Sequence, residues 1–123
     1  MIIDGRSIAN TILLDLHTKI ENLTIKPKLS VLLVGENPAS LSYIKQNEHS
    51  AIVAGIDFEL RQMSVDITEE DLIACIHEMN TNVSVSGFIV QLPLPKHINI
   101  NTVIEAIDPK KDVDGFTSQN IGK

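Results

Sequence analysis

The chain has 123 residues, of which 43% are apolar and 21% charged, and its formal net charge is −6. These values are typical of one soluble globular domain, and two domains would not fit. No apolar stretch approaches the roughly 18 residues that a membrane span requires, and the acidic balance argues against electrostatic binding to nucleic acid. A single cysteine cannot form an intramolecular disulfide, and the first residues lack the pattern of a secretory signal. We therefore expect a cytoplasmic protein.

The first half of the chain alternates between helical and strand periodicity. Between residues 6 and 23, apolar residues recur every four positions, which predicts an amphipathic helix with this stripe facing the core. The stripe consists of Ile8, Ile12, Leu16 and Ile20. Residues 29–34 form a short aliphatic run, as a buried strand of a parallel sheet does. Asn37 and Pro38 form a helix-starting pair and Gly55 is a helix-ending residue, so a second helix is expected between them.

The second half of the chain repeats this alternation. Residues 56–63 alternate apolar and polar side chains, which predicts a strand at or near a sheet edge. Thr68 and Asp71 have the spacing of a capping box for a third helix. Residues 85–92 predict another buried strand, and residues 101–107 predict a short last helix. Strands alternating with helices favour an α/β fold, and we expect a three-layer α/β/α sandwich with a mainly parallel sheet.

Residue spacing argues against several common sites. The six glycines never lie within two residues of each other, whereas the phosphate-binding loops for NAD(P) or ATP need clustered glycines. The histidines are scattered, and even the nearest pair, His77 and His97, is 20 positions apart. Cys75 lies among apolar helix residues, which favours core packing over a role as nucleophile or ligand. We therefore expect no structural metal and no nucleotide loop of these kinds.

A parallel sheet binds its ligand beyond the carboxyl ends of its strands. The segments concerned here follow Val34, Met63 and Val90. Just after the first of these strands, Ser40, Tyr43 and Asn47 lie within about 60° of each other on the predicted second helix. Such a polar stripe is commonly a solvated face. The alternative is a ligand surface on which the chain's only tyrosine stacks against a flat group.

Two further segments carry unusual polar residues. Gln91 ends an apolar strand and precedes a double-proline turn. Burying its side-chain amide without hydrogen-bond partners would destabilise the fold by a few kcal/mol. A polar neighbour or a ligand is therefore expected to bond it. Near the end of the chain, Asp114 and Gly115 stand between two apolar residues. This segment is either a solvated turn or a turn that aims one carboxylate inward.

Together these segments resemble a known family. The stretches IDGR, VLLVGENPASLSYI, VSGFIVQLPLP and KKDVDGFTSQNIGK look like the methylenetetrahydrofolate dehydrogenase/cyclohydrolase family, and the resemblance spans residues 1–123. It implies the N-terminal catalytic, folate-binding domain of a bifunctional enzyme. Such an enzyme oxidises 5,10-methylenetetrahydrofolate with NADP and hydrolyses 5,10-methenyltetrahydrofolate to 10-formyltetrahydrofolate, in one-carbon metabolism and purine biosynthesis. The substrate is expected in a cleft between two domains.

The resemblance also implies roles for individual residues. Tyr43 corresponds to the tyrosine that packs against the folate ring system, Gln91 to the cleft glutamine, and Asp114 to the aspartate that bonds the pterin. The implied catalytic positions are those of Asn47, Gln91 and Asp114. The implied substrate-binding residues are Ser40, Tyr43, Gln91, Leu92, Pro93 and Asp114.

The chain departs from the family pattern at Asn47, where the resemblance implies the catalytic lysine of S-x-x-Y-x-x-x-K. An amide has no proton to transfer at neutral pH, so the proton transfers of the cyclohydrolase step are in doubt. Lys45 is not an evident replacement, because it lies about 160° around the helix from Asn47. His49 is also expected to point away. A non-catalytic folate-binding remnant or pseudoenzyme subunit is therefore the alternative function.

The second departure from the family concerns the cofactor. The NADP-binding Rossmann domain that the resemblance implies is absent from this chain, in keeping with the absence of a glycine fingerprint. A domain without its neighbour would expose apolar surface, so self-association as a homodimer is expected. A third function, a flavodoxin-like signalling module, would need several carboxylates after the first strand to hold Mg²⁺. Only Glu36 is present there.

Overall fold

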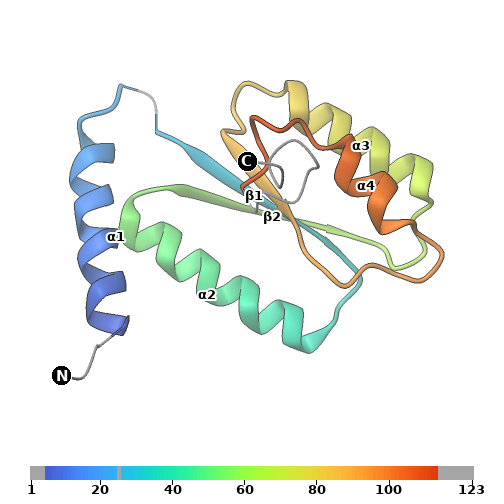
Figure 1. The fold of residues 1–123 in the computed structure, drawn as a ribbon, viewed down its shortest axis with the longest axis horizontal. Coiled ribbons are helices and arrows are strands. Elements are labelled where there is room, and N and C mark those ends of the chain that lie inside the picture. Colours follow the sequence, from blue (N-terminus) through green and yellow to red (C-terminus); the bar gives the residue numbers. More distant parts are fainter. Residues whose placement is uncertain (1–4, 25, 114–123) are drawn as a thin grey trace.

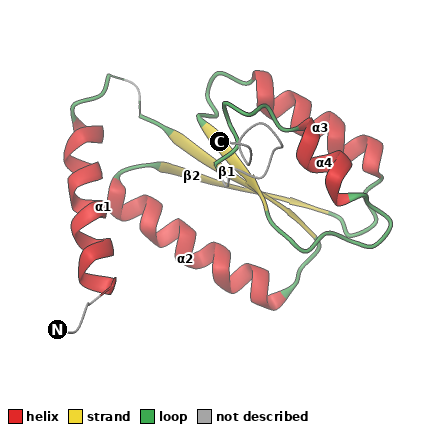
Figure 2. Ribbon diagram, viewed as in Figure 1, coloured by secondary structure: helices red, strands yellow, loops and turns green. Residues whose placement is uncertain are grey.

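The computed structural model describes residues 5–24 and 26–113. Its elements are α1 (Gly5–Glu21), β1 (Lys28–Val34), α2 (Pro38–Ala54), β2 (Asp57–Met63), α3 (Glu69–Thr81), β3 (Gly87–Val90) and α4 (Ile100–Ala106). The three strands form one parallel sheet in the order β2-β1-β3. Helix α2 covers one face of the sheet, and α3 and α4 cover the other (Figures 1 and 2). The expected three-layer α/β/α fold is confirmed.

The central strand β1 is buried because both of its neighbours and both helix layers cover it. Its residues from Ser30 to Val34 are all buried, as the aliphatic run predicts. The strand β2 lies at an edge of the sheet, as predicted, and its residues are half-buried or exposed. The strand β3 covers only part of the predicted 85–92 segment. The amide of Gln91 nevertheless donates to the carbonyl of Leu32 at 2.9 Å and extends the β1–β3 ladder by one bond.

Successive side chains of a strand point to opposite faces of the sheet, so the apolar core is divided between these two faces. On the α3–α4 face, the buried cluster is Leu32, Val34, Leu72, Ile76, Met79, Val85, Phe88, Val90, Leu94, Ile98, Val103 and Ile107. Cys75 packs at its margin, in accord with the expected core role. On the α2 face the cluster is smaller and contains Val31, Leu33 and Ile44. The α3–α4 layer therefore contributes most of the buried apolar surface among the described residues.

The helix boundaries follow the local signals in the sequence. The Asn37 side chain accepts hydrogen bonds from the amides of Ala39 and Ser40, at 2.9 and 3.2 Å, and Pro38 begins α2. Gly55 ends this helix with a left-handed φ of 82°. These contacts confirm the predicted start and end of α2. Likewise, the Thr68 hydroxyl accepts from the amide of Asp71 at 3.1 Å and caps α3.

The predicted orientation of α1 is wrong. Ile8 and Ile12 are 51% and 55% exposed, and Leu16 is also exposed, so the apolar stripe does not face the core. The helix instead lies beside the C-terminal end of α2, where His17 and Ile20 are close to Gly55 (Figure 1). Among the described elements, α1 makes its main contacts with α2. Periodicity identifies an amphipathic helix but does not say which neighbour covers its apolar side.

Candidate functional site

The carboxyl ends of the three parallel strands meet at one end of the molecule, where a ligand is expected. Between the ends of β1 and β2 lies an open groove of about 720 Å³. Its lining residues are Gly35, Glu36, Gln62, Met63, Ser64 and Val65. The Gln62 amide donates to the carbonyl of Gly35 at 3.0 Å and ties the two strand ends together. Among the described residues, none of those predicted as site residues from the sequence lines this groove.

The polar residues of this groove were not predicted as site residues from the sequence. These residues are Glu36, Gln62 and Ser64, which lie at or just after the carboxyl ends of β1 and β2. A parallel sheet binds its ligand at these ends, so their positions were those of candidate site residues. Single polar residues at strand ends are common, however, and nothing in their spacing distinguished them. Only the pairing of β1 with β2 brings them together.

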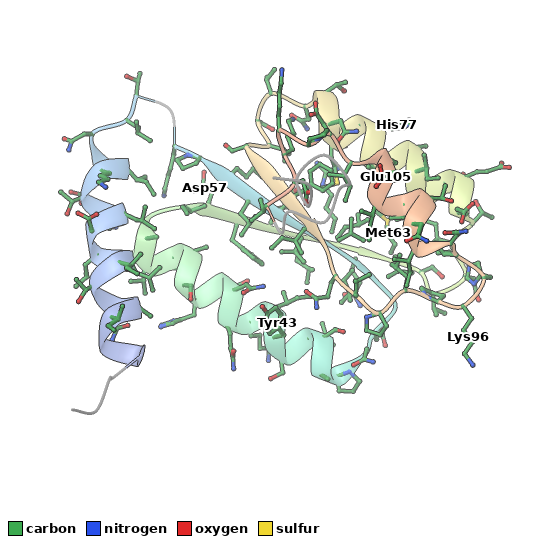
Figure 3. The ribbon with its side chains drawn as sticks, in the orientation of Figure 1. Tyr43, Asp57, Met63, His77, Lys96 and Glu105 are labelled. Carbon is green, nitrogen blue, oxygen red and sulfur yellow. The ribbon has the colours of Figure 1, made fainter. Side chains whose placement is uncertain are left out.

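The predicted polar stripe lies at the start of α2, directly after β1. Ser40 is 5% exposed, and its amide is held by the Asn37 cap. Tyr43 is 56% exposed, and Asn47 is half-buried. Tyr43 therefore presents an accessible ring on α2, across the sheet from α3 and α4 (Figure 3).

Gln91 follows the strand β3 and lies on the same side of the sheet as α2. Side chains alternate along a strand, and because Val90 belongs to the α3–α4 core while Ile89 packs on the α2 face, Gln91 projects toward the α2 face. Its side-chain amide donates to the carbonyl of Leu92 at 3.2 Å. Within the described part of the chain, its oxygen accepts no hydrogen bond. The polar neighbour predicted for Gln91 is thus an adjacent backbone carbonyl, and half of the amide is available to a ligand.

The two flanks of α2 face different strands. Glu48 and Ile52 line a groove with Asp57 and Phe58, so this flank faces β2. At about 100° per residue, Tyr43 lies on the opposite flank, with Asn47 between it and the centre of the sheet-facing side. This flank faces β3, the strand that Gln91 follows. No hydrogen bond joins these α2 side chains to Gln91 within residues 26–113.

The other candidate residues do not complete this arrangement. Lys45 and His49 are both exposed, in keeping with the prediction that neither replaces the missing lysine. Leu92 is half-buried and Pro93 is exposed beside Gln91. Asp114 lies outside the described residues. Among the residues that the structure describes, no three His, Cys, Asp or Glu side chains are grouped to hold a metal ion.

The main charged cluster lies away from this end of the molecule. Glu59 and Arg61 on β2 contact at 2.7 Å, and Lys28 at the start of β1 lies 3.2 Å from Glu59. Arg61 also reaches Glu78 on α3 at 2.6 Å. The hydrogen bond from Arg61 lowers the pKa of Glu59 to about 2, and the Glu59 carboxylate raises the pKa of Arg61 above its usual range. This cluster joins β2 to α3 and belongs to the scaffold.

Comparison with known proteins identifies the family. Residues 3–114 match the family described as tetrahydrofolate dehydrogenase/cyclohydrolase, catalytic domain. The chain belongs to this family. It is 46% identical over 127 aligned residues to the bifunctional protein FolD of Helicobacter pylori strain HPAG1, an alignment that covers 100% of this chain and 44% of that protein. The chain thus spans less than half the length of this relative.

Solved structures of family members have the same fold. The 5,10-methylenetetrahydrofolate dehydrogenase of the silkworm, Bombyx mori, superposes with a TM-score of 0.92 at 40% identity, over 97% of this chain and 42% of that one. The Trypanosoma brucei dehydrogenase-cyclohydrolase was solved with NADP and an inhibitor. It superposes with a TM-score of 0.91 at 27% identity, over 99% of this chain and 43% of that one.

The described residues do not fit the phosphates of NADP. At the start of α2, the amides of Ala39 and Ser40 already bond Asn37, so they are not free to receive a phosphate oxygen. The first turn of α3 carries Glu69, Glu70 and Asp71, whose charges would repel a phosphate. In addition, none of the helices in the described part has both the length and the hydropathy to cross a membrane.

Proposed function

We propose that this chain is the folate-binding domain of an enzyme that oxidises 5,10-methylenetetrahydrofolate with NADP and hydrolyses 5,10-methenyltetrahydrofolate. Family membership supports this reaction class. The observation that carries the proposal is that Tyr43 on α2 and Gln91 after β3 lie on the same face of the sheet, toward the carboxyl ends of its strands. A flat ring between them would have an aromatic surface on one side and a carboxamide on the other.

Each candidate residue has a distinct task in this proposal. The exposed ring of Tyr43 stacks on the folate ring system, and the Gln91 oxygen, which has no partner in the described residues, accepts a hydrogen bond from it. Ser40 lies one turn before Tyr43 on α2, and Leu92 and Pro93 directly follow Gln91 in the chain. The carboxylate of Asp114 bonds the amino group and ring N–H of the pterin, which together form a two-donor edge that suits a carboxylate.

The chemistry of the two steps assigns Asn47 a restricted role. NADP, bound by another part of the enzyme, supplies the hydride acceptor, and this domain holds the donor carbon in place. In the hydrolysis, water attacks the methenyl carbon and the bond from that carbon to one ring nitrogen breaks. As the formyl C=O forms, the water gives up both of its protons: the departing ring nitrogen takes one and the other is released. Asn47 can hold the water or the ring by hydrogen bonds, but it cannot transfer a proton at neutral pH.

The first test is binding. Isothermal titration calorimetry of the 123-residue chain with 5,10-methenyltetrahydrofolate should show saturable binding with one site. Tyr43→Ala should weaken it about tenfold, because the stacking surface is lost. Ile52→Ala, which removes an exposed apolar side chain from the other flank of α2, should leave it unchanged. No saturable binding by the wild-type chain would refute the proposal.

Asn47 also supports the alternative that this domain binds folate without hydrolysing the methenyl group. The test is to fuse the domain to a family NADP-binding domain and to assay both steps with Asn47 and with Asn47→Lys. We expect the lysine to raise cyclohydrolase activity by about 10²- to 10⁴-fold, the usual contribution of a positioned acid or base, and to change the dehydrogenase step less. Equal hydrolysis by both fusions would show that another group transfers the proton.

The remaining parts of the proposal concern cellular context. We infer a cytoplasmic enzyme whose product, 10-formyltetrahydrofolate, serves purine biosynthesis. The exposed apolar residues Ile8 and Ile12 of α1 support self-association as a homodimer. Light scattering of the purified chain measures its mass in solution. We expect a dimer for the wild type and a monomer for the double variant Ile8→Ser and Ile12→Ser.

A further inference from the structure

The loop between β3 and α4 is fastened at its far end to the loop that precedes α3. The Nε2 of His97 lies 2.8 Å from the carbonyl oxygen of Ile67, and because a carbonyl can only accept, the imidazole donates this hydrogen bond. The backbone amide of Asn99 donates to a carboxylate oxygen of Glu69 at 2.6 Å. Figure 1 shows the two loops side by side, with the loop before α4 in orange and the loop before α3 in yellow-green.

The loop before α4 contains a turn that is closed by its own hydrogen bond. The amide of Ile98 donates to the carbonyl of Pro95 at 3.0 Å, so His97 projects from a four-residue turn. Leu94 and Ile98 are buried in the core on the α3–α4 face, and Ile67 packs at its margin. His97 is exposed. Its hydrogen bond therefore holds the outer side of the turn, while the two buried apolar residues hold the inner side.

A short and stiff piece of backbone joins this turn to Gln91. The piece contains two prolines, Pro93 and Pro95, whose rings fix φ and leave the chain few ways to bend. The carbonyl of Leu92 is the group to which the Gln91 side-chain amide donates, at 3.2 Å. A shift of the turn would therefore move this carbonyl, and with it the carboxamide of Gln91.

From these contacts we infer that His97 and Glu69 are positioning residues of the folate site. They hold the turn after Gln91 in place and so set the orientation of its carboxamide. The inference rests on the proposed function, in which the Gln91 oxygen accepts a hydrogen bond from the folate ring system. Neither His97 nor Glu69 touches the substrate. Both act through the backbone that carries the Leu92 carbonyl.

The test substitutes each of these two residues and an exposed neighbour that makes neither contact. His97→Ala is paired with Lys96→Ala in the same turn, and Glu69→Ala with Glu70→Ala in the first turn of α3. Each member of the second pair removes one carboxylate from the same helix turn, so the effect of charge on α3 is similar in both. His97→Gln is the conservative variant, because its side-chain amide can still donate to the carbonyl of Ile67.

Three quantities are measured on the 123-residue chain. The first is the affinity for 5,10-methenyltetrahydrofolate by calorimetry. The other two are measured by NMR without ligand. The hydrogen-exchange protection of the Ile98 amide reports on the turn, and the chemical shifts of the Gln91 side-chain amide report on its orientation. Urea denaturation measures any global loss of stability, for which the exchange data are corrected.

We expect His97→Ala and Glu69→Ala each to weaken folate affinity about fivefold, equivalent to the loss of one hydrogen bond. Both variants should reduce Ile98 protection beyond the global loss of stability and shift the Gln91 side-chain signals. His97→Gln should restore most of the affinity and most of the protection.

The control variants Lys96→Ala and Glu70→Ala should leave affinity within about twofold of the wild type. Equal losses of affinity in the two members of a pair, unchanged Ile98 protection, or reduced protection with unchanged affinity would overturn the inference. If the wild-type chain binds no folate, the proposed function fails and the role in folate binding fails with it. The two NMR measurements then still decide whether His97 and Glu69 hold the turn and orient Gln91.

Discussion

Replacing Glu59 by glutamine should destabilise the fold, because this carboxylate is the centre of the charged cluster between β2 and α3. One of its oxygens accepts from the Ser30 hydroxyl at 3.0 Å and from Arg61 at 2.7 Å. The other lies 3.2 Å from the ammonium of Lys28. A glutamine of the same shape can keep one of these contacts with Ser30, but it removes the charge that both cations share. The substitution therefore isolates the electrostatic part of the cluster.

The pKa of Glu59 sets the size and the pH range of the effect. Its pKa falls from 4.5 to about 2 in the folded protein, chiefly through the hydrogen bond from Arg61. At about 1.4 kcal/mol per pKa unit this shift sets an upper limit of roughly 3 kcal/mol. The side chain is 31% exposed, so solvent screening reduces the expected loss to about 1–2 kcal/mol. Because the folded pKa is lowered, the stabilisation is complete above pH 4.5 and is lost as the pH falls toward 2.

The free energies of unfolding of the wild type and of Glu59→Gln are measured by urea denaturation, followed by circular dichroism, at several pH values between 7 and 3. Glu59→Gln should lower the free energy of unfolding by about 1–2 kcal/mol at pH 7 and pH 5, and the gap should narrow below pH 4.5. Glu70→Gln is the control, since Glu70 is exposed and forms no ion pair within the described residues. Equal stability at pH 7, or a gap that stays constant to pH 3, would refute the electrostatic reasoning.

Three further predictions concern the helix ends and the cofactor. Asn37→Ala should cost about 1 kcal/mol in urea denaturation, because the amides of Ala39 and Ser40 lose their acceptor; an unchanged midpoint would contradict this role. Gly55→Ala should lower the thermal midpoint by several degrees at a cost of about 1–2 kcal/mol, because its φ is 82° and a Cβ would lie 3.0 Å from Nδ1 of His17. His17→Ala in the same background should relieve part of this loss. Calorimetry with NADP should show no saturable binding to this chain, and micromolar affinity would reveal a site that the occupied α2 amides do not explain.

The local signals in the sequence determined where the elements begin and end. The Asn37–Pro38 pair and Gly55 bound α2, and Thr68 caps α3 through its own side chain. These interactions join residues only a few positions apart, so both residues of each interaction lie within one short stretch of the sequence. The continuous aliphatic run of β1 likewise predicted a central strand, because only a strand covered on both faces is apolar along its whole length.

The arrangement of those elements was decided by tertiary contacts. The apolar stripe of α1 is largely exposed and α1 packs mainly against α2. Periodicity could not predict this, because it specifies an apolar side of a helix but not the neighbour that covers it. Glu59 and Arg61 lie two positions apart on β2, so the spacing places them on one face of that strand. The contact of Glu59 with Lys28 forms only after β1 and β2 pair, and that of Arg61 with Glu78 only after α3 packs beside β2.

Some features of the candidate site could likewise be predicted from the sequence, whereas others depend on tertiary contacts. Tyr43 and Gln91 could be singled out from the sequence, because Tyr43 is the chain's only tyrosine and Gln91 stands between an apolar strand and a double-proline turn. That Tyr43 lies on the flank of α2 nearer β3, and that His97 and Glu69 anchor the loop before α4, could not. These contacts join residues 30 positions apart, and their geometry exists only once the sheet and both helix layers are assembled.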